Sequence, residues 1–384
     1  MESILKQGAV HARPEQKRSQ SFSGIQPLSP LTVATQLFQP LPPPIGLPPY
    51  HYDLGDAIPG IADQAVKNGK IIFHTVGDTG GINYAEYQKI VTTAMKSDLN
   101  LPIAQRPSFF FHLGDVVYFN GEPSKYYAQF YDPYDHYSAP IFSIPGNHDG
   151  DPLPNTSQKS LDGWIEFFMT SVPHVDPLSA DAPRVTMSQP NVYFTLVCPF
   201  VTIVGLYTNV PEGGSVESVQ QQWLTNELFT APTDKALIVC MHHPIYSFDN
   251  HHSGSPAMAD VLQHAINDSR RIPNMVLTGH VHNFQRIERE ILKGKPTPFL
   301  VAGNGGYHNL HHLTAKSGTT DSNTGATLRF GDDTHHGYVT LTIDQKNISG
   351  KYASFDNNGK PGKSDNFKYP VDARFLAKNV VINL

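Results

Sequence analysis

The sequence predicts an α/β fold made of layered sheets and helices. Two observations support this prediction. Short apolar runs recur along the chain, such as KIIFHTVGD at 70–78 and KALIVCMHHP at 235–244, and continuous runs of this length are typical of strands buried on both faces. Segments with apolar residues at helical spacing lie between these runs, and such alternation of strand and helix indicates stacked layers of the two.

The individual elements follow from these signals in chain order. The apolar runs predict strands at 70–78, 108–115, 139–149, 191–197, 200–207, 235–244, 273–282, 297–306 and 337–343. Apolar residues at helical spacing predict helices at 83–98, 160–171, 215–229 and 255–269. The stretch 308–336 is rich in Gly, Thr, Asn and His and predicts one long loop, a kind of segment that often carries function.

Composition divides the chain into three regions. Residues 1–60 are rich in proline and predict an extension without regular structure, which would be a flexible arm by composition; packing against the body of the protein is the alternative. Residues 61–345 hold the pattern of strands and helices and predict one central domain. Residues 346–384 predict a strand and a hairpin that pack on this domain as a tail.

Composition also excludes some classes of partner. The net charge is −6 and no basic stripe stands out, so we expect no nucleic-acid polymer as a partner. No run of about 18 apolar residues occurs, so we expect no membrane span.

The N-terminus lacks the apolar core of a signal peptide, which favours a cytoplasmic location; a secreted or periplasmic location is the alternative if a leader is missing. The oligomeric state stays open.

Five of the predicted strands end in side chains that can bind metal ions. Loops at strand ends converge while the strands hold them rigid, so we expect these side chains to meet. Glycines at 77, 114, 146 and 279 precede them and fit sharp exits from a sheet. The candidate ligands, in chain order, are Asp78, Asp115, Tyr118, Asn147, His242, His280 and His282.

The chemistry of this donor set indicates which metals it would hold. Carboxylates, an amide oxygen, imidazoles and a phenol without any thiolate favour iron, manganese or zinc. Seven donors exceed the needs of one ion, and a single aspartate can bridge two. Two ions about 3.5–4 Å apart form a clamp for in-line displacement at phosphorus. The set therefore predicts a binuclear centre.

The order of the five motifs resembles the calcineurin-like metallophosphoesterase superfamily, and specifically its purple acid phosphatases. The resemblance covers roughly residues 68–345, and singly each motif is weak evidence. It implies a four-layer fold in which two mixed β-sheets pack as a sandwich flanked by helices, with 61–345 as the catalytic domain. The motifs are Asp78-Thr79-Gly80, Gly114-Asp115-Val116-Val117-Tyr118, Gly146-Asn147-His148-Asp149, Val239-Cys240-Met241-His242 and Gly279-His280-Val281-His282.

One departure selects the purple acid phosphatase branch. Most of the superfamily carries a histidine two residues after the first aspartate, where this chain has Gly80, and Tyr118 supplies the replacement donor. The resemblance implies two ions that share Asp115 as a bridge, Fe(III) and a divalent iron, zinc or manganese. Fe(III) would be held by Asp78, Asp115, Tyr118 and His282, and the divalent ion by Asp115, Asn147, His242 and His280.

The resemblance also implies roles on the substrate side. His148, beside Asn147, would contact the phosphate or protonate the leaving oxygen. A second substrate-side imidazole would be His251, which lies nine residues after His242, with His252 as its competitor. Asp149 would orient His148 rather than bind metal.

Two neighbouring histidines must be told apart. His242 and His243 point to opposite sides if they continue a strand. The family pattern selects His242 as the ligand, because it lies two residues before Pro244. We expect His243 to be packed, or to support the ligands from behind.

The predicted activity is hydrolysis of phosphate monoesters of a small phosphorylated substrate, by attack of a metal-bound hydroxide. The alternative is a phosphodiesterase or nucleotide pyrophosphatase of the same superfamily, which would differ in the loops at 119–138, 150–190 and 308–336. A non-catalytic, metal-stabilised binding module is disfavoured, because all predicted ligands and His148 are present.

Overall fold

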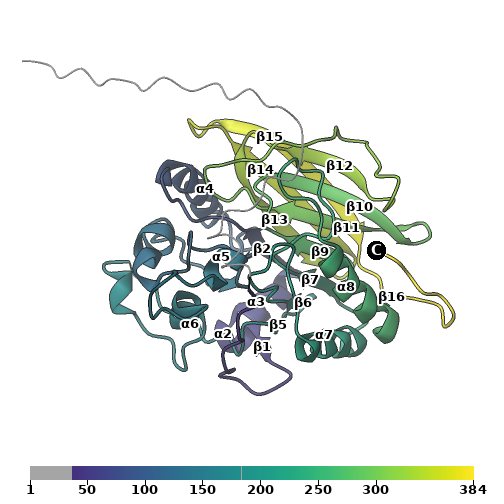
Figure 1. The fold of residues 1–384 in the computed structure, drawn as a ribbon, viewed down its shortest axis with the longest axis horizontal. Helices are drawn as coiled ribbons and strands as arrows, with labels where there is room; N and C mark the ends of the chain where they lie inside the picture. Colours follow the sequence, from purple (N-terminus) through teal and green to yellow (C-terminus); the bar gives the residue numbers. More distant parts are fainter. Residues whose placement is uncertain (1–36, 183) are drawn as a thin grey trace, which may run out of the picture.

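The structure is a computed structural model that describes residues 37–182 and 184–384. The first part of the predicted proline-rich extension, residues 1–36, lies outside the described residues. The fold is shown in Figure 1.

Two mixed sheets form the centre of the described chain. In the larger sheet the strand order is β1 (His51–Asp53), β5 (Phe194–Val197), β6 (Val201–Gly205), β7 (Ala236–Cys240), β9 (Met275–Thr278), β11 (Lys295–Ala302), β10 (Phe284–Leu292) and β12 (Thr327–Asp332). In the smaller sheet it is β15 (Pro361–Pro370), β14 (Asn347–Phe355), β13 (His336–Asp344), β2 (Lys70–Val76), β3 (Phe109–His112) and β4 (Ile141–Ser143).

The strands that lead to candidate ligands pair in parallel within each sheet. In the smaller sheet β2, β3 and β4 run parallel, with Val76 opposite His112 and His112 opposite Ser143. In the larger sheet β7 and β9 run parallel, with Cys240 opposite Leu277. Parallel neighbours end at the same edge of a sheet. The ligand-bearing loops of each sheet therefore leave it together.

A shared hydrophobic core joins the two sheets. Phe73, Phe109 and Phe111 of the smaller sheet belong to the same buried cluster as Ile238 and Leu277 of the larger one. All residues of β3 and β7 are buried, because each sheet is also covered on its outer face. This double burial explains why the strands appear as continuous apolar runs and do not alternate.

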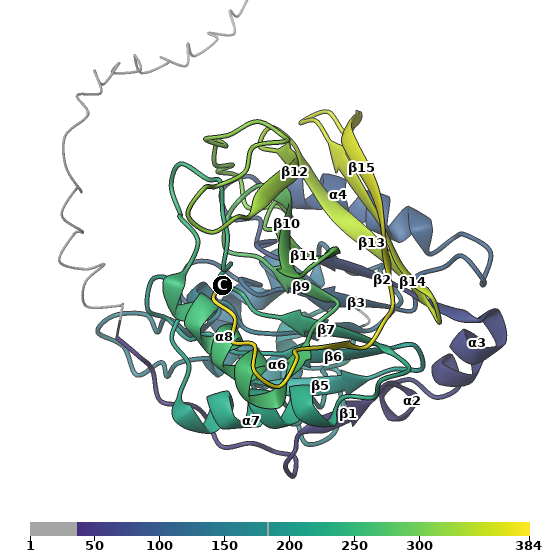
Figure 2. The same ribbon diagram turned by 90° about the vertical axis from the view of Figure 1, so that its right-hand side faces the viewer.

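Helices cover the outer faces of the sandwich, as Figure 2 shows. Helix α4 (Ala85–Asp98) contacts β13 and β14 of the smaller sheet. Helices α7 (Ser218–Thr230) and α8 (Pro256–Ser269) pack against each other on the side of the larger sheet. The predicted fold class, two mixed sheets packed together and flanked by helices, is confirmed.

Short elements complete the described chain. None of its helices is both long and apolar enough to cross a bilayer. The short helices are α2 (Leu54–Ala57), α3 (Ile61–Asn68), α5 (Asn147–Gly150), α6 (Asp162–Phe168), η1 (Pro123–Lys125), η2 (Tyr127–Tyr131) and η3 (Pro177–Ser179), and β8 (Arg271–Ile272) pairs with β16 (Arg374–Phe375).

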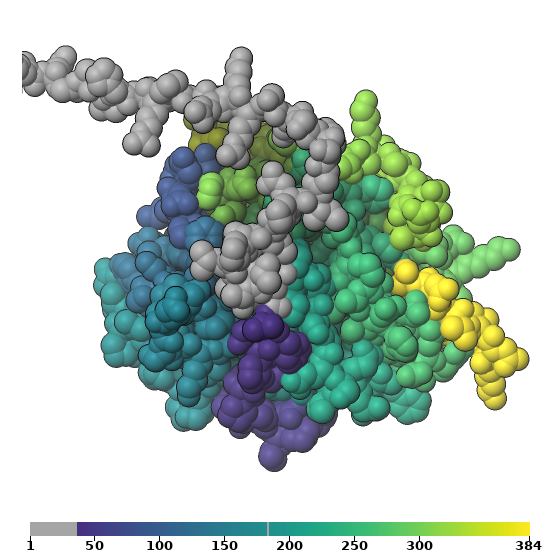
Figure 3. Space-filling model, viewed as in Figure 1, coloured from purple at the N-terminus to yellow at the C-terminus, as the bar shows by residue number. Residues whose placement is uncertain are grey.

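Residues 37–60 differ from the predicted flexible arm, because they pack on the domain. Strand β1 joins the edge of the larger sheet beside β5. The indole Nε1 of Trp223 donates to the carbonyl of Pro49 at 2.7 Å, and the side chain of Asn209 exchanges two hydrogen bonds with the backbone of Gln39. Figure 3 shows this purple segment lying directly on the teal part of the surface. A proline-rich composition did not reveal these tertiary contacts.

The predicted loop at 308–336 also differs in part, because it contains β12. This strand pairs antiparallel with β10, which the sequence pattern missed as well. β12 is the edge strand of the larger sheet and β10 is its neighbour, and polar residues alternate with apolar ones in β10, as in FQRIEREIL. Within residues 346–384 the chain forms β14, β15 and β16.

Candidate metal centre

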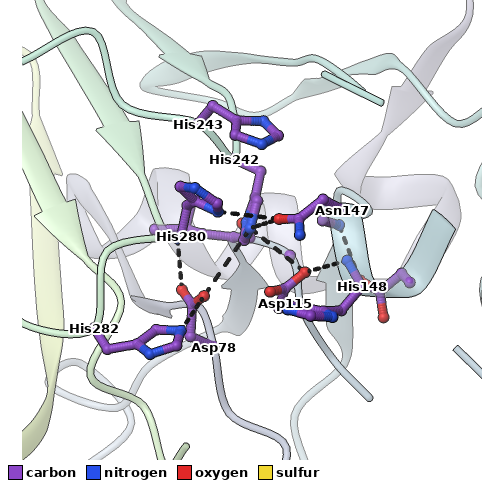
Figure 4. A network of polar contacts seen from close by, with 12 residues as sticks. Asp78, Asp115, Asn147, His148, His242, His243, His280 and His282 are labelled. Atoms are coloured by element: carbon purple, nitrogen blue, oxygen red, sulfur yellow. Dashed lines mark hydrogen bonds and ion pairs between the residues drawn. The ribbon is translucent and has the colours of Figure 1, made fainter. Parts of the chain in front are cut away.

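The five predicted strand ends bring their side chains together at one place (Figure 4). Asp78 follows β2, Asp115 follows β3, and Asn147 opens helix α5 after β4. From the other sheet, His242 follows β7, and His280 with His282 follows β9. The site is therefore built by loops from both halves of the sandwich.

One group of donor atoms gathers around the amide oxygen of Asn147. The Oδ1 atom of Asn147 lies 3.1 Å from Nε2 of His242 and 3.0 Å from Nδ1 of His280. The same Nε2 of His242 is 3.4 Å from Oδ1 of Asp115. These four side chains are the ones that the resemblance assigns to a divalent ion.

A second group of donor atoms gathers around Asp78. Its Oδ1 atom accepts a hydrogen bond from the Tyr118 hydroxyl at 3.1 Å and lies 3.5 Å from Nε2 of His282. The Tyr118 hydroxyl is 3.3 Å from the same Nε2 atom. The two groups adjoin, since Nε2 of His242 is 4.0 Å from Oδ1 of Asp78.

Asp115 lies where the two groups meet, and one of its oxygens lacks a partner. Its Oδ1 accepts from the backbone N–H of His148 at 3.0 Å. Its Oδ2 is buried and has no hydrogen-bond partner among the described residues. A buried carboxylate oxygen without a partner is costly, and a cation beside it would remove the cost. Ligand atoms of Asp78, Asp115 and His242 all lie within 4.8 Å of one another. The residues present therefore fit metal ions, with Asp115 placed to bridge.

Hydrogen bonds behind the imidazoles fix which nitrogen faces the site. His242 Nδ1 donates to the carbonyl of Leu113 at 2.8 Å, and His282 Nδ1 donates to that of Asn309 at 3.0 Å. A proton held at Nδ1 leaves Nε2 as the free lone pair that a metal ion binds. Both histidines therefore present the correct tautomer toward the candidate centre.

The electrostatics of these groups also indicate a place for positive charge. Burial, reinforced by the charge of Asp115, raises the pKa of Asp78 to about 7. Burial lowers the pKa of His242, but attraction to the Asp115 carboxylate outweighs this effect and raises the pKa to about 9. Burial and the two carboxylates raise the pKa of the Tyr118 phenol well above its usual value. An ionised Tyr118 therefore requires a strong cation next to its oxygen.

Three of the candidate ligands have strained backbones. Asp78, Asp115 and His280 have φ angles of 56°, 54° and 67°, in the left-handed region that residues other than glycine seldom adopt. Each such residue costs about 1–3 kcal/mol and persists only where the surroundings hold it. Strain of this kind gathers at functional sites, and motif spacing alone did not reveal it.

Gly80 leaves the space that the ring of Tyr118 occupies. A β-carbon at Gly80 would lie 2.8 Å from Cδ2 of Tyr118 and 2.4 Å from Oε1 of Gln129. Gln129 in turn holds the backbone N–H and carbonyl of Tyr118 through hydrogen bonds of 3.0 and 2.9 Å. The tyrosine ring therefore fills the space that a side chain at position 80 would need.

We expect Gly80→Ala to destabilise the metal-free protein by about 1–3 kcal/mol, the usual cost of overpacking. Neither Tyr118 nor Gln129 can retreat without losing the hydrogen bonds between them. Urea unfolding in the presence of a chelator measures the change. A loss below about 0.5 kcal/mol, the range of neutral surface substitutions, would show that the two residues do not exclude each other.

Asp149 takes a different role from the predicted one. Its carboxylate accepts the backbone N–H groups of Gly146, Val116 and Val117 at 2.9–3.2 Å. His148 Nδ1 instead donates to the carbonyl of Phe119 at 2.9 Å. Asp149 therefore ties two ligand-bearing loops together and does not orient His148. The Asp149 carboxylate lies close to backbone N–H groups of Gly146 and of the loop after β3, whereas the His148 side chain points away from it.

His148 lines a cavity of about 270 Å³ that opens over the candidate ligands. His251 and His252 also line it. His243 is buried, with Nδ1 2.7 Å from the hydroxyl of Thr208, and its ring lies outside the converging donors in Figure 4. His243 is thus packed behind the site, as expected.

Three of the cavity residues that the sequence analysis did not assign contact the predicted ones or lie near them. Glu212 lies 3.0 Å from Nδ1 of His252 and 3.4 Å from Nε2 of His280, so that one carboxylate steadies both imidazoles. The ring of Tyr307 lies 4.2 Å from that of Tyr118, between centroids. His311 is the third. Tyr307 follows the glycines at 305–306 and His311 lies in the loop predicted to be functional, whereas nothing in the sequence distinguishes Glu212.

Comparison with known families identifies the class of protein. The model of the calcineurin-like phosphoesterase family matches residues 72–284, which is more than half of the chain. The chain therefore belongs to the calcineurin-like phosphoesterases, a family of metal-dependent hydrolases. No curated protein matches it in sequence.

Solved structures with the same fold include three distant relatives. The purple acid phosphatase PPD1 from yellow lupin (Lupinus luteus) seeds is 20% identical over 79% of this chain and 54% of its own, with a TM-score of 0.57. GAP50, the anchor in the inner membrane complex of Plasmodium, is 14% identical over 81% and 90%, with a TM-score of 0.53. PhoD is 14% identical over 82% and 72%, with a TM-score of 0.53. This chain spans about half the length of the lupin protein, and such likeness shows the fold alone.

Proposed function

We propose that this protein hydrolyses phosphate monoesters at a binuclear metal centre of the purple acid phosphatase kind. The observation that carries the proposal is the arrangement of the donors in two adjoining groups, with the Tyr118 phenol in one and the unpartnered Asp115 oxygen between them. A tyrosine next to Asp78 and His282 distinguishes this centre from one built with a histidine at position 80.

Two ions would share the donors. Fe(III) would bind Asp78, Asp115, Tyr118 and His282, because a phenol with a raised pKa needs a highly charged ion to lose its proton. A divalent iron, zinc or manganese would bind Asp115, Asn147, His242 and His280. Bound ions of this kind supply Lewis acidity and a hydroxide nucleophile near neutral pH.

The chain's own residues bind the substrate and move a proton. Asn147 and His148 lie side by side at the start of α5 and line the cavity, as do His251 and His252. Because the carbonyl of Phe119 holds Nδ1–H of His148, its Nε2 is the nitrogen left to contact the phosphate or to protonate the leaving oxygen. The small cavity suits a small phosphorylated substrate.

Paired substrates test the reaction class. We expect turnover of p-nitrophenyl phosphate to exceed that of bis(p-nitrophenyl) phosphate, because a monoester leaves three phosphoryl oxygens free for the cations and His148. A preference for the diester would overturn the monoesterase assignment and favour a phosphodiesterase. No turnover of either substrate by protein with two bound ions would favour a binding module.

Tyr118→Phe tests the branch. We expect the wild-type protein loaded with Fe(III) to show a visible tyrosinate-to-iron charge-transfer band, and Tyr118→Phe to lose it. Tyr307→Phe is the matched control, since its ring packs directly on Tyr118 without joining the donor groups, and it should keep the band. An active, colourless protein that holds only zinc would contradict the assignment.

A further inference from the structure

A second cluster of imidazoles lies at the rim of the cavity, beside the candidate centre. His251 and His252 come from the loop that follows β7, and His311 comes from the loop between β11 and β12. One ring nitrogen from each lies within 4.8 Å of the other two. The ring centroids of His251 and His252 lie 4.7 and 5.2 Å from that of His311. These three residues are called the rim trio below.

A single carboxylate holds the rim trio together. Asp249, which is only 9% exposed, accepts the backbone N–H groups of His251 and His252 at 2.7 and 2.6 Å through Oδ1. Its Oδ2 accepts from the side chain of Asn283 at 2.9 Å. The same Oδ1 atom lies 3.7 Å from Nδ1 of His311. Asp249 therefore fixes the backbone of His251 and His252 and lies beside the ring of His311.

His311 is the member that a purely structural role explains least. It is 6% exposed, and its buried Nδ1 has no hydrogen-bond partner among the described residues, since Oδ1 of Asp249 is 3.7 Å away. Its Nε2 makes no hydrogen bond to a described residue either, so a ring that lines the cavity has a nitrogen free to bind an ion. Asp249 lies on the Nδ1 side of the ring, where a carboxylate can orient a metal-binding histidine.

We propose that His251, His252 and His311 form a third metal-ion site, for a borderline divalent ion such as Zn²⁺, separate from the binuclear centre. Three neutral imidazoles are donors that Zn²⁺ favours, and they leave a fourth position open to the cavity. Tetrahedral Zn²⁺ requires ligand nitrogens about 3.4 Å apart at bond lengths of about 2.0–2.1 Å. The exposed side chain of His251 can close the remaining gap.

Acidic groups around the rim trio offset the added charge. Asp249 lies beneath it, and Glu212 lies 3.0 Å from Nδ1 of His252. Under the proposed function, on which this consequence rests, an ion at the rim occupies His251 and His252. Excess Zn²⁺ therefore competes with the phosphate ester and inhibits its hydrolysis.

Direct detection of the ion tests the site without any reference to turnover. Crystals of the full chain grown with Zn²⁺ should show an anomalous difference peak bounded by the three imidazoles of the rim trio. Peaks elsewhere with none at this position would overturn the proposal, whether or not the protein is a phosphatase.

Metal counting in variants provides the second test. We expect His311→Gln to bind one Zn²⁺ fewer per chain than the wild-type protein when each is titrated by calorimetry. The matched control is His312→Gln, because the neighbouring His312 is exposed and pairs with Asp333 outside the trio. It should bind as the wild-type protein does. Equal counts in His311→Gln and the wild-type protein would overturn the proposal.

Discussion

Asp115→Asn is expected to lower kcat on p-nitrophenyl phosphate by at least about 10³-fold. The carboxylate lies between both donor groups, and its Oδ2 has no partner in the described chain. Its loss removes the bridge and the negative charge that hold two cations together, which is worth several kcal/mol of transition-state stabilisation. Steady-state kinetics together with metal analysis of the purified variant measure the effect.

The same substitution separates a metal site from a structural carboxylate. Ligands that bind only the folded state raise its stability, by about 2.7 kcal/mol at a concentration 100 times Kd. We expect the wild-type protein to gain thermal stability when metal is added after chelation, and Asp115→Asn to gain much less. Asp63→Asn, at an exposed position of α3, is the control. If Asp115→Asn kept both its metal content and its activity, the bridging role would be wrong.

His148→Ala is expected to lower kcat by about 10²–10⁴-fold, the usual contribution of a general acid, without loss of bound metal. The residue adjoins the ligand Asn147 and lines the cavity, but its ring is held by Phe119 and lies outside the two donor groups. Kinetics and metal analysis of the variant distinguish loss of the acid from loss of the centre.

Substrates with different leaving groups test whether His148 acts as an acid or only binds the phosphate. If it protonates the departing oxygen, its removal must harm an alkyl phosphate more than p-nitrophenyl phosphate, whose leaving group needs little protonation. Equal losses on both substrates would instead indicate that His148 only binds the phosphate. His136→Ala, at an exposed histidine outside the cavity, serves as the control.

The sequence could predict that these side chains come together because the relevant signals are local. Each candidate ligand follows a run of apolar residues within a few positions, and a strand buried on both faces requires such a run wherever it occurs. The parallel order of β2, β3 and β4 then carries Asp78, Asp115 and Asn147 to one edge. Strand, turn and ligand are thus encoded within about ten residues of one another, and the family match confirmed the fold they build.

Features that depend on distant contacts could not be predicted in this way. Residues 37–60 look like a linker, but Asn209 and Trp223, far along the chain, hold them in place. Asp149 was assigned to His148 because the two are adjacent in sequence, whereas its partners come from Gly146 and from the loop after β3. Glu212 comes to His280 and His252 only when the loop after β6 folds over the cavity.

The most direct test of the central claim is to count the metal ions in the purified protein while measuring its turnover of p-nitrophenyl phosphate. Titration of the chelated wild-type protein follows the number of bound ions and the activity together. We predict that activity appears as two ions bind per chain and that it is lost again on chelation. Full activity with one ion or none, or no activity with two ions in place, would contradict a binuclear phosphatase centre.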